Sequence, residues 1–348
     1  IIAIPTLKGS KLNHVIDLCV STHCAVQLLS DPQLVGSGTP QQGAFRELNP
    51  ADFLSRDEVT LDTNQISGYL TGKTVLVTGG GGSIGSELCR QVMRFKPGKL
   101  LIFDIYENCA YELLMELQQK YGRDIPVTVL IGSIRDKKRL DEVFETYHPT
   151  VVFHAAAHKH VPLMEVSPAE AVKNNVLGTK NLLVSASEHD VERFVQLSTD
   201  KAVNPTSVMG CTKRICEMLI QTFAGNTDMK CVAVRFGNVL GSHGSVIPLF
   251  EAQIKKGGPV TLTDPNIERY FMTIPEAAQL VLQAGALAES GNIYVLDMGE
   301  PVKIMDLAKQ LIRFYGYEPG VNMEIKIVGL RPGEKLYEEL MMDEEQDK

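Results

Sequence analysis

The residues best suited to chemistry form one run, Ser198-Thr199-Asp200-Lys201, at the end of the apolar segment Phe194–Ser198. Hydroxyl, carboxyl and ammonium groups follow one another there, where a predicted strand ends, and such groups can act together as general acid and base. Met209 and Lys213 come next on a predicted helix, and their spacing of four residues puts both on one face. We therefore expect the strand end and this helix to border one catalytic pocket.

A second group of residues has the spacing of a nucleotide-binding turn. The run Thr78-Gly79-Gly80-Gly81-Gly82-Ser83-Ile84-Gly85 follows an apolar strand and begins a helix. Glycines at 79, 82 and 85 allow a tight turn and a close approach to a pyrophosphate, which the amino end of a helix favours. The next strand ends at Asp104, whose carboxylate can bind the adenosine ribose hydroxyls and disfavours the 2′-phosphate of NADP. The pattern predicts NAD as cofactor.

Alternating strands and helices must position both groups. The predicted strands are Thr74–Thr78, Leu100–Asp104, Val127–Ile131, Val151–His154, Phe194–Ser198 and Cys231–Phe236, and the predicted helices between them are Ser83–Arg94, Glu107–Tyr121, Lys137–Tyr147, Ala169–Ser187 and Ser207–Phe223. This alternation is typical of βαβ units, and nearly continuous apolar strands indicate a sheet covered on both faces. The sequence therefore predicts an α/β fold: a Rossmann-type doubly wound parallel sheet with a smaller C-terminal substrate-binding lobe.

The texture of the chain changes twice and suggests three parts. We expect residues 1–70 to be the remnant of an upstream module and a linker, because this region is irregular and contains a polar Gly/Pro/Gln stretch at 36–43. Residues 71–236 are expected to form the NAD-binding Rossmann domain. Residues 237–348 are expected to form mainly the substrate-binding lobe, with helices at 246–256, 276–287 and 304–315 and a strand at 293–298.

Composition excludes several other classes of protein. The chain has 348 residues, 44% hydrophobic and 22% charged, which is typical of a folded protein. A net charge of −8 without a long basic run argues against a nucleic-acid partner. Seven cysteines without metal-type pairs argue against a disulfide framework and against a metal site. No apolar run approaches the ~20 residues of a membrane helix.

The chain begins Ile1-Ile2-Ala3, without a methionine. We therefore expect a longer protein, in which a missing N-terminal region tethers a cytoplasmic catalytic domain to the inner membrane.

These features resemble a known superfamily. The glycine turn, Ala155-Ala156-Ala157 at a strand end, Ser198-Thr199 and Lys213 are similar to the extended short-chain dehydrogenase/reductases. Longer motifs at residues 159–165, 199–210, 235–242 and 330–335 resemble the membrane-associated UDP-N-acetylglucosamine 4,6-dehydratases of bacterial polysaccharide and glycoprotein sugar synthesis. The expected cofactor-binding residues are then Thr78, Gly79, Gly82, Ser83, Ile84, Gly85, Asp104, Ala155, Ala156, Ser198 and Lys213.

The resemblance implies a three-step reaction that converts UDP-N-acetylglucosamine to the UDP-2-acetamido-2,6-dideoxy-4-keto-hexose with retention at C5. Hydride leaves the sugar C4 for NAD, water is eliminated across C5 and C6, and the hydride returns to C6. Because oxidation at C4 acidifies the C5 proton, a base must remove it while an acid protonates the departing C6 hydroxyl. By likeness to related dehydratases we expect Lys201 to be that base and Asp200 that acid, provided that burial or substrate contact keeps Asp200 protonated.

One position departs from the superfamily, since Met209 stands where Tyr-x-x-x-Lys has tyrosine. A thioether cannot accept the C4 hydroxyl proton, so we expect Thr199, with Asp200 or a water, to pass it on while Lys213 holds the nicotinamide ribose. Simple packing is the alternative role of Met209.

Substrate ligands are expected among isolated cations and amides near strand ends: His158, Lys159, Asn238, Arg269, Arg331 and Glu334. Arg269 and Arg331 suit a diphosphate because a guanidinium offers paired donors, although a solvated surface role is the alternative for each. Asn238 can bond base or sugar oxygens.

Other functions on this fold stay open. A UDP-hexose 4-epimerase needs only C4 chemistry, which leaves Asp200 and Lys201 without a task, and C5-inverting dehydratases resemble the superfamily in keeping the tyrosine. A non-catalytic NAD-binding protein is the alternative from another class. The resemblance further implies a UDP-sugar as substrate and a homo-oligomer, a dimer or larger.

Overall fold

The computed structural model describes residues 1–4, 9–20, 22, 26–29, 45–47, 62–242 and 244–345. By their contacts the residues fall into two compact units. We call Thr60–Gly237, Ile274–Gly299 and Arg331–Lys348 the sheet unit, and Ile1–Val59, Asn238–Thr273 and Glu300–Leu330 the small unit.

The sheet unit is built on seven parallel strands in the order β13-β8-β7-β6-β3-β4-β5. They are β3 (Thr74–Thr78), β4 (Lys99–Asp104), β5 (Val127–Ile131), β6 (Val151–His154), β7 (Arg193–Leu197), β8 (Lys230–Arg235) and β13 (Ile293–Val295). The order reverses between β3 and β6, which is the place where doubly wound sheets bind ligands at the carboxyl ends of their strands. The predicted Rossmann-type sheet is confirmed.

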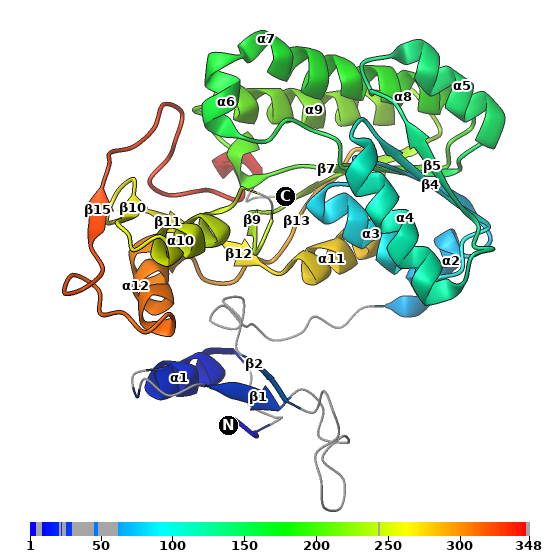
Figure 1. Cartoon of the computed structure of the whole chain (residues 1–348). Helices are drawn as coiled ribbons and strands as arrows, with labels where there is room; N and C mark the ends of the chain where they lie inside the picture. Colours follow the sequence, from blue (N-terminus) through cyan, green and yellow to red (C-terminus); the bar gives the residue numbers. More distant parts are fainter. Residues whose placement is uncertain are drawn as a thin grey trace, which may run out of the picture. The chain divides into compact units, whose positions relative to one another are not determined.

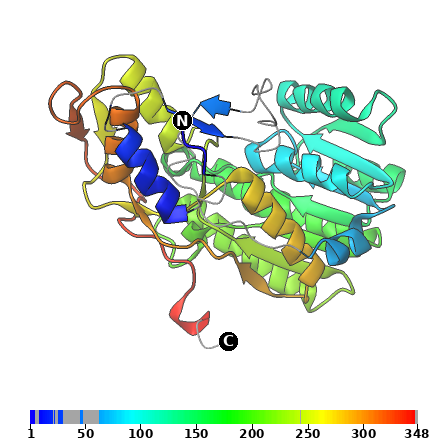
Figure 2. The ribbon, with the colours of Figure 1, turned by 90° about the horizontal axis from the view of Figure 1, so that it is seen from below.

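Helices cover both faces of this sheet (Figure 1). On one face lie α5 (Lys137–Tyr147), α8 (Gly178–Glu188) and α9 (Val208–Ala224), and on the other lie α2 (Thr63–Leu70), α3 (Ser83–Arg94), α4 (Glu107–Tyr121) and α11 (Ile274–Leu287), which Figure 2 shows from below. The central strands are fully buried at Val75, Leu76, Val152 and Phe153. Burial on both sides explains why these strands read as unbroken apolar runs.

The helix expected over residues 169–187 is interrupted. Short helix α6 (Val161–Val166) is followed by α7 (Pro168–Ala171), a π-helical turn at Val172–Leu177, and then α8. Asn174 and Asn175 lie in that turn. Asparagine side chains compete for backbone hydrogen bonds, and π-turns inside helices are frequent at functional sites.

Of the region expected to be an upstream remnant and linker, the described parts contribute to both units, and the polar stretch at 36–43 lies outside the described residues. Helix α2 buries Ile66 and Leu70 completely, and the Tyr69 hydroxyl donates to the Leu282 carbonyl of α11 (2.7 Å), so the sheet unit starts before residue 70. In the small unit, Ile16 and Leu28 belong to the apolar core. The apolar side chains of these segments are therefore part of the folded cores of the two units.

The small unit consists of short elements around that core. Its members are α1 (Gly9–Val20), β1 (Gln27–Leu29), β2 (Phe45–Glu47), β9 (Asn238–Val239), α10 (Val246–Lys255), β10 (Val260–Leu262), β11 (Glu268–Arg269), β12 (Phe271–Met272), β14 (Val302–Lys303), α12 (Ile304–Phe314) and β15 (Ile325–Ile327). The described strands of this unit form two-stranded sheets, and Phe250, Leu307 and Leu311 are buried in its apolar core.

The expected C-terminal lobe is therefore divided between the units. Residues 274–299 add α11 and β13 to the sheet unit, and residues 331–348 join it as well. A substrate-binding role for the remainder stays a prediction. Within the described part of the chain, no helix has the length and apolar character needed to cross a bilayer.

Candidate active site

The glycine turn leaves no room for side chains where a pyrophosphate would approach. Gly79 has a φ of +67°, and a Cβ there would stand 2.6 Å from the Ala156 nitrogen. A Cβ on Gly85 would stand 2.0 Å from the Gly79 carbonyl oxygen. The turn follows Thr78 and caps α3 at Gly82, so the first N–H groups of the helix point to the carboxyl edge of the sheet. Ser83 and Ile84 form the first turn of that helix.

Asp104 fixes the turn from the neighbouring strand. Its carboxylate accepts hydrogen bonds from the N–H groups of Gly81 (2.8 Å) and Tyr106 (2.9 Å). Each carboxylate oxygen has a second lone pair, so ribose hydroxyls can still be accepted. The turn, the helix end and this carboxylate together fit the adenosine diphosphate half of a dinucleotide.

The end of β6 completes the wall beside the turn. Ala155 donates its N–H to the Thr78 carbonyl (3.0 Å), and Ala155 and Ala156 are only partly buried. Beneath them His154 is fully buried between the hydroxyls of Thr78 (2.7 Å) and Thr179 (2.9 Å). Burial, with Lys213 nearby, lowers the pKa of His154 to about 3, so the ring is neutral. It is a structural residue that ties β3 to α8.

The predicted catalytic run lies where β7 ends. Asp200 is fully buried, and its Oδ1 accepts hydrogen bonds from the Thr199 hydroxyl (2.8 Å) and the Lys201 ammonium (2.9 Å). Its Oδ2 is buried and has no hydrogen-bond partner among the described residues. Because a buried polar atom without a partner is unfavourable, this oxygen is suited to a ligand hydroxyl or a proton.

Helix α9 brings the other two predicted residues to the same strand end. The Lys213 ammonium donates to the Leu197 carbonyl, and burial lowers its pKa, against the opposing influence of Cys216 and Glu217. Met209, one turn earlier, is 3% exposed and packs with Met164 and Ala171 in a small apolar cluster. The thioether therefore has a packing partner, which supports its alternative role.

Two unpredicted side chains cap α9. The Ser207 hydroxyl accepts from the Gly210 N–H (3.1 Å), and the Glu165 carboxylate of α6 accepts from the Val208 N–H (2.7 Å). A Cβ at Gly333, where φ is +76°, would lie 2.7 Å from the Ser207 Cβ. The motifs at 159–165, 199–210 and 330–335 thus meet at one helix end.

The C-terminal segment, residues 331–345, lies along the catalytic run. Lys335 donates to the Val203 carbonyl (2.9 Å), and the Thr206 hydroxyl donates to the Gly333 carbonyl (3.2 Å). Glu338, whose side chain is 2% exposed, stands 3.4 Å from the Lys201 ammonium. No local pattern marks Glu338, because its contact depends on the folded path of the segment.

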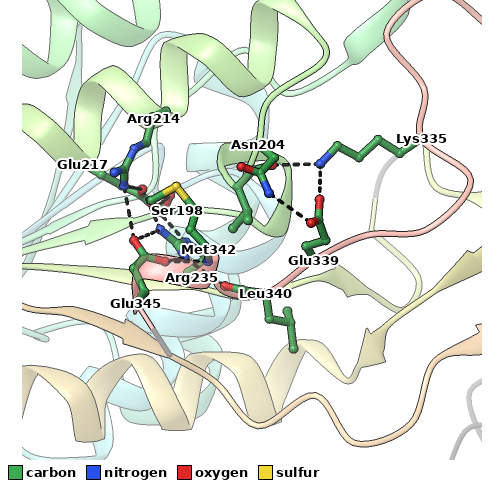
Figure 3. A network of polar contacts seen from close by, with 11 residues as sticks. Ser198, Asn204, Arg214, Glu217, Arg235, Lys335, Glu339, Leu340, Met342 and Glu345 are labelled. Carbon is green, nitrogen blue, oxygen red and sulfur yellow. Dashed lines mark hydrogen bonds and ion pairs between the residues drawn. The ribbon is translucent and has the colours of Figure 1, made fainter. Parts of the chain in front are cut away.

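A buried charge network anchors the same segment (Figure 3). Ser198 donates its hydroxyl to Glu217 of α9 (2.6 Å), and Glu217 pairs with Arg235 at the end of β8 (2.9 Å). Arg235, fully buried, also donates to the Leu340 carbonyl (2.8 Å) and pairs with Glu345 (2.7 Å). Burial alone would lower the pKa of Arg235, but the hydrogen bonds to Glu217 and Glu345 raise it above its usual range.

The hydroxyl of Ser198, which was predicted to bind the cofactor, thus already donates to the buried Glu217 carboxylate of α9. The motif at 235–242 contributes its arginine to this anchor.

Asn175 was missed and organises the loop after β6. Its amide oxygen accepts from the His158 N–H (2.8 Å), and its NH₂ donates to the His158 carbonyl (2.9 Å) and the Thr212 hydroxyl (3.0 Å). The side chains of His158 and Lys159 remain exposed, although surrounding protein lowers the pKa of both. Two asparagines inside a predicted helix were the available signal for this residue.

The remaining predicted substrate residues lie in both units. In the sheet unit, Arg331 is 56% exposed and pairs with Glu334 through two hydrogen bonds of 3.2 and 3.3 Å. In the small unit, Arg269 is 8% exposed and donates to the Glu268 carbonyl (2.7 Å), and the Asn238 N–H donates to the Tyr270 carbonyl (3.1 Å). The structure describes each unit by itself, so the meeting of these residues at one substrate stays a prediction.

No group of three or more histidine, cysteine, aspartate and glutamate side chains among the described residues has metal-binding geometry.

Comparison with known proteins gives a family match. The pattern of the family described as "Polysaccharide biosynthesis protein" covers residues 75–348. The capsular polysaccharide biosynthesis protein CapD of Staphylococcus aureus is 54% identical over 344 residues, which are 98% of this chain and 57% of that protein. The chain thus spans little more than half of that relative. A UDP-N-acetylglucosamine 4,6-dehydratase (inverting) of Campylobacter jejuni is 34% identical over 76% of each chain.

Solved structures share the fold. The X-ray structure of Pen from Bacillus thuringiensis is 37% identical, with a TM-score of 0.73 over 78% of this chain and 84% of that one. The UDP-glucose 4-epimerase of Thermus thermophilus in complex with NAD is 24% identical, with a TM-score of 0.65 over 75% of this chain and 88% of that one.

Proposed function

Because this chain belongs to the polysaccharide biosynthesis protein family, we propose that it is the catalytic part of an NAD-dependent UDP-N-acetylglucosamine 4,6-dehydratase. The product is the UDP-2-acetamido-2,6-dideoxy-4-keto-hexose, with the configuration at C5 retained, for bacterial glycan or glycoprotein sugar synthesis. The enzyme is a hydro-lyase, and its relatives named for a dehydratase and for capsular polysaccharide synthesis support dehydration in sugar synthesis. Because that dehydratase is named inverting, the proposed retention at C5 rests on Met209, which stands where inverting dehydratases keep tyrosine.

NAD binds along the carboxyl edge of the sheet. Gly79, Gly82 and Gly85 let the pyrophosphate approach the start of α3, and Asp104 accepts the adenosine ribose hydroxyls. Lys213, held at the end of β7, binds the nicotinamide ribose. Held there, NAD would supply a hydride acceptor for C4 of the sugar and a hydride donor for C6.

The protein's own groups handle the protons. The Thr199 hydroxyl receives the C4 hydroxyl proton and hands its own to Asp200 Oδ1, 2.8 Å away. Protonated Asp200 then protonates the C6 hydroxyl as it leaves as water, while Lys201 takes the proton from C5. This assignment gives the missing tyrosine's task to Thr199 and Asp200.

One observation carries the proposal: an adjacent carboxyl and amine at a strand end, with the carboxyl fully buried and its Oδ2 without a partner among the described residues. Oxidation and reduction at C4 alone do not require such a pair. Elimination of water across C5 and C6 requires an acid and a base together.

The experiment incubates the purified protein, with NAD, and UDP-N-acetylglucosamine, and identifies the product by mass spectrometry and NMR. A mass lower by one water, with unchanged configuration at C5, supports the proposal. Inversion at C5 points to the inverting dehydratase, an unchanged mass with inversion at C4 points to a 4-epimerase, and no conversion points to a non-catalytic NAD-binding protein.

The full-length protein is proposed to hold this domain on the cytoplasmic face of the inner membrane through its N-terminal region, and to form a dimer or larger homo-oligomer. Membrane fractionation of the full-length protein and light scattering of the purified chain test the two statements.

A further inference from the structure

Among the described residues Lys201 has two carboxylates within 4 Å of its ammonium, and one of them, Glu338, lies outside the catalytic run. Its ammonium lies 2.9 Å from Asp200 Oδ1 and 3.4 Å from Glu338 Oε1. Both carboxyl side chains are almost completely inaccessible, at 0% and 2% exposure, whereas the Lys201 side chain is 22% exposed. The ammonium is thus the central member of a row of three ionisable groups.

In the proposed reaction, the charge of Lys201 is a difficulty. A lysine that takes the C5 proton must first be an uncharged amine, and carboxylates on two sides favour its ammonium form. Asp200 cannot relieve it of a proton, because Asp200 already carries the proton that came from the C4 hydroxyl. Glu338 is the other carboxylate that the described part of the chain places within 4 Å of the ammonium.

We propose that Glu338 is the proton acceptor that makes Lys201 a base. The inference rests on the proposed dehydratase function and deepens it. Glu338 acts through Lys201 and is therefore a positioning residue, supplied to the site by the C-terminal segment.

The protons balance over one cycle. At the start Asp200 and Glu338 are ionised and Lys201 is charged, and the C4 hydroxyl proton then reaches Asp200 through Thr199. An N–H bond of Lys201 breaks and an O–H bond forms on Glu338, which leaves a neutral amine.

In the elimination the amine takes the C5 proton, the electron pair of that bond forms the C5–C6 double bond, and the C6–O bond breaks. The leaving hydroxyl takes the proton of Asp200 and departs as water. After C6 has been reduced, Lys201 returns its proton to C5, and Glu338 returns its proton to Lys201. Every group ends in its first state.

The fold holds Glu338 against Lys201 from both sides along the segment. Before it, Lys335 donates to the Val203 carbonyl, two residues beyond Lys201. After it, Arg235 binds the Leu340 carbonyl and the Glu345 carboxylate from inside the sheet unit (Figure 3). These contacts, one before and one after Glu338, give the carboxylate a fixed place, as a relay needs.

The test compares wild type, Glu338→Gln and Glu338→Asp, with Glu344→Gln as the matched control. Glu344 lies on the same segment, but its side chain is exposed. For each protein, water loss from UDP-N-acetylglucosamine is measured as kcat and KM from about pH 6 to 9, together with NAD binding and thermal melting.

Glu338→Gln is expected to lower kcat ~100-fold or more, the usual range for loss of a proton-transfer group, with KM and NAD binding little changed. Its kcat is expected to rise with pH where the wild-type value is flat, because the Lys201 proton must then leave to solvent. Glu338→Asp restores a carboxylate and with it the flat profile at a reduced kcat, and it serves as the test if the glutamine variant does not fold. Glu344→Gln behaves as wild type.

The inference is overturned if Glu338→Gln keeps the wild-type kcat, or if its pH profile and that of Glu338→Asp both keep the wild-type shape at equal loss. The wild-type product decides the proposed function separately. Water loss by wild type with no special effect at Glu338 refutes only the relay, whereas a product of unchanged mass refutes the dehydratase and removes the task of Lys201.

Discussion

Replacement of Arg235 by methionine tests the anchor of the C-terminal segment. Methionine keeps much of the length of the side chain but removes a charge that is 0% exposed. Glu217, also 0% exposed, would keep the Ser198 hydroxyl (2.6 Å) and Arg214 (3.0 Å) as its partners among the residues that the structure describes. Breaking a buried pair from one side typically costs about 3 to 5 kcal/mol, and because Arg214 still compensates part of the Glu217 charge we expect the lower end of this range, about 3 kcal/mol.

A loss of about 3 kcal/mol corresponds to a melting temperature lower by about 6 to 12 °C for a unit of this size. Differential scanning fluorimetry and urea unfolding measure it, with Arg313→Met as control. Arg313 is 45% exposed and pairs with Glu318 at 3.9 Å, so its loss is expected to change stability by less than about 0.5 kcal/mol.

The double variant Arg235→Met/Glu217→Gln separates charge from shape. If the Glu217 carboxylate causes the loss because it has lost Arg235, the double variant is more stable than Arg235→Met alone. A single variant that melts like wild type, or a double variant less stable than either single one, would refute the reasoning.

Three further predictions follow from other parts of the sheet unit. Gly85→Ala is expected to abolish NAD binding in calorimetry, because its Cβ would stand 2.0 Å from the Gly79 oxygen. The control Gly68→Ala, whose Cβ would meet nothing within 4 Å, should bind NAD normally, and its free energy of unfolding should rise by about 0.5 kcal/mol. Equal NAD affinity in both variants would contradict this prediction. Asp104→Asn keeps an acceptor for the Gly81 N–H but loses the charge, so NAD affinity should fall about tenfold and the discrimination against NADP should shrink; an unchanged NAD/NADP ratio counts against the role of Asp104. The pKa of His154 is lowered from 6.5 to about 3 in the folded protein, so between these pH values the unfolded chain takes up a proton that the folded chain does not. The free energy of unfolding is therefore unaffected by this group above pH 6.5 and falls by up to about 1.4 kcal/mol per pH unit from there down to about pH 3. Urea unfolding at several pH values should find this slope in wild type and not in His154→Gln.

Local signals explain which elements could be predicted from the sequence. Strands β3, β5 and β6 and helices α3, α4 and α5 have the predicted bounds. Their apolar periodicity is reinforced by end signals such as Asp136, which caps α5 through the Arg139 N–H, and Gly122, which ends α4 with a φ of +98°. Where apolar periodicity and end signals agree, the tertiary structure keeps the bounds that they predict.

In the candidate site, the sequence could indicate the residues at the end of β7 and on α9 but not the residues that pack against them. Asp200, Lys201 and Lys213 could be named as candidates because their residue types stand at a predicted strand end and on one face of a predicted helix, and their catalytic roles stay predictions. Glu338 and Glu217 were not, because their roles arise from long-range packing that no spacing along the chain records. Ile16 and Ile66 likewise lie in a region predicted as an upstream remnant and linker, but both are completely buried in the folded protein. Their burial depends on residues far away in the sequence.

The central claim concerns the base at the end of β7, and the most direct measurement is product formation by Lys201→Ala beside Lys180→Ala, an exposed lysine of α8. The account predicts that Lys201→Ala binds NAD as wild type does but releases no product that has lost water, while Lys180→Ala turns over normally. Full turnover by Lys201→Ala would contradict it.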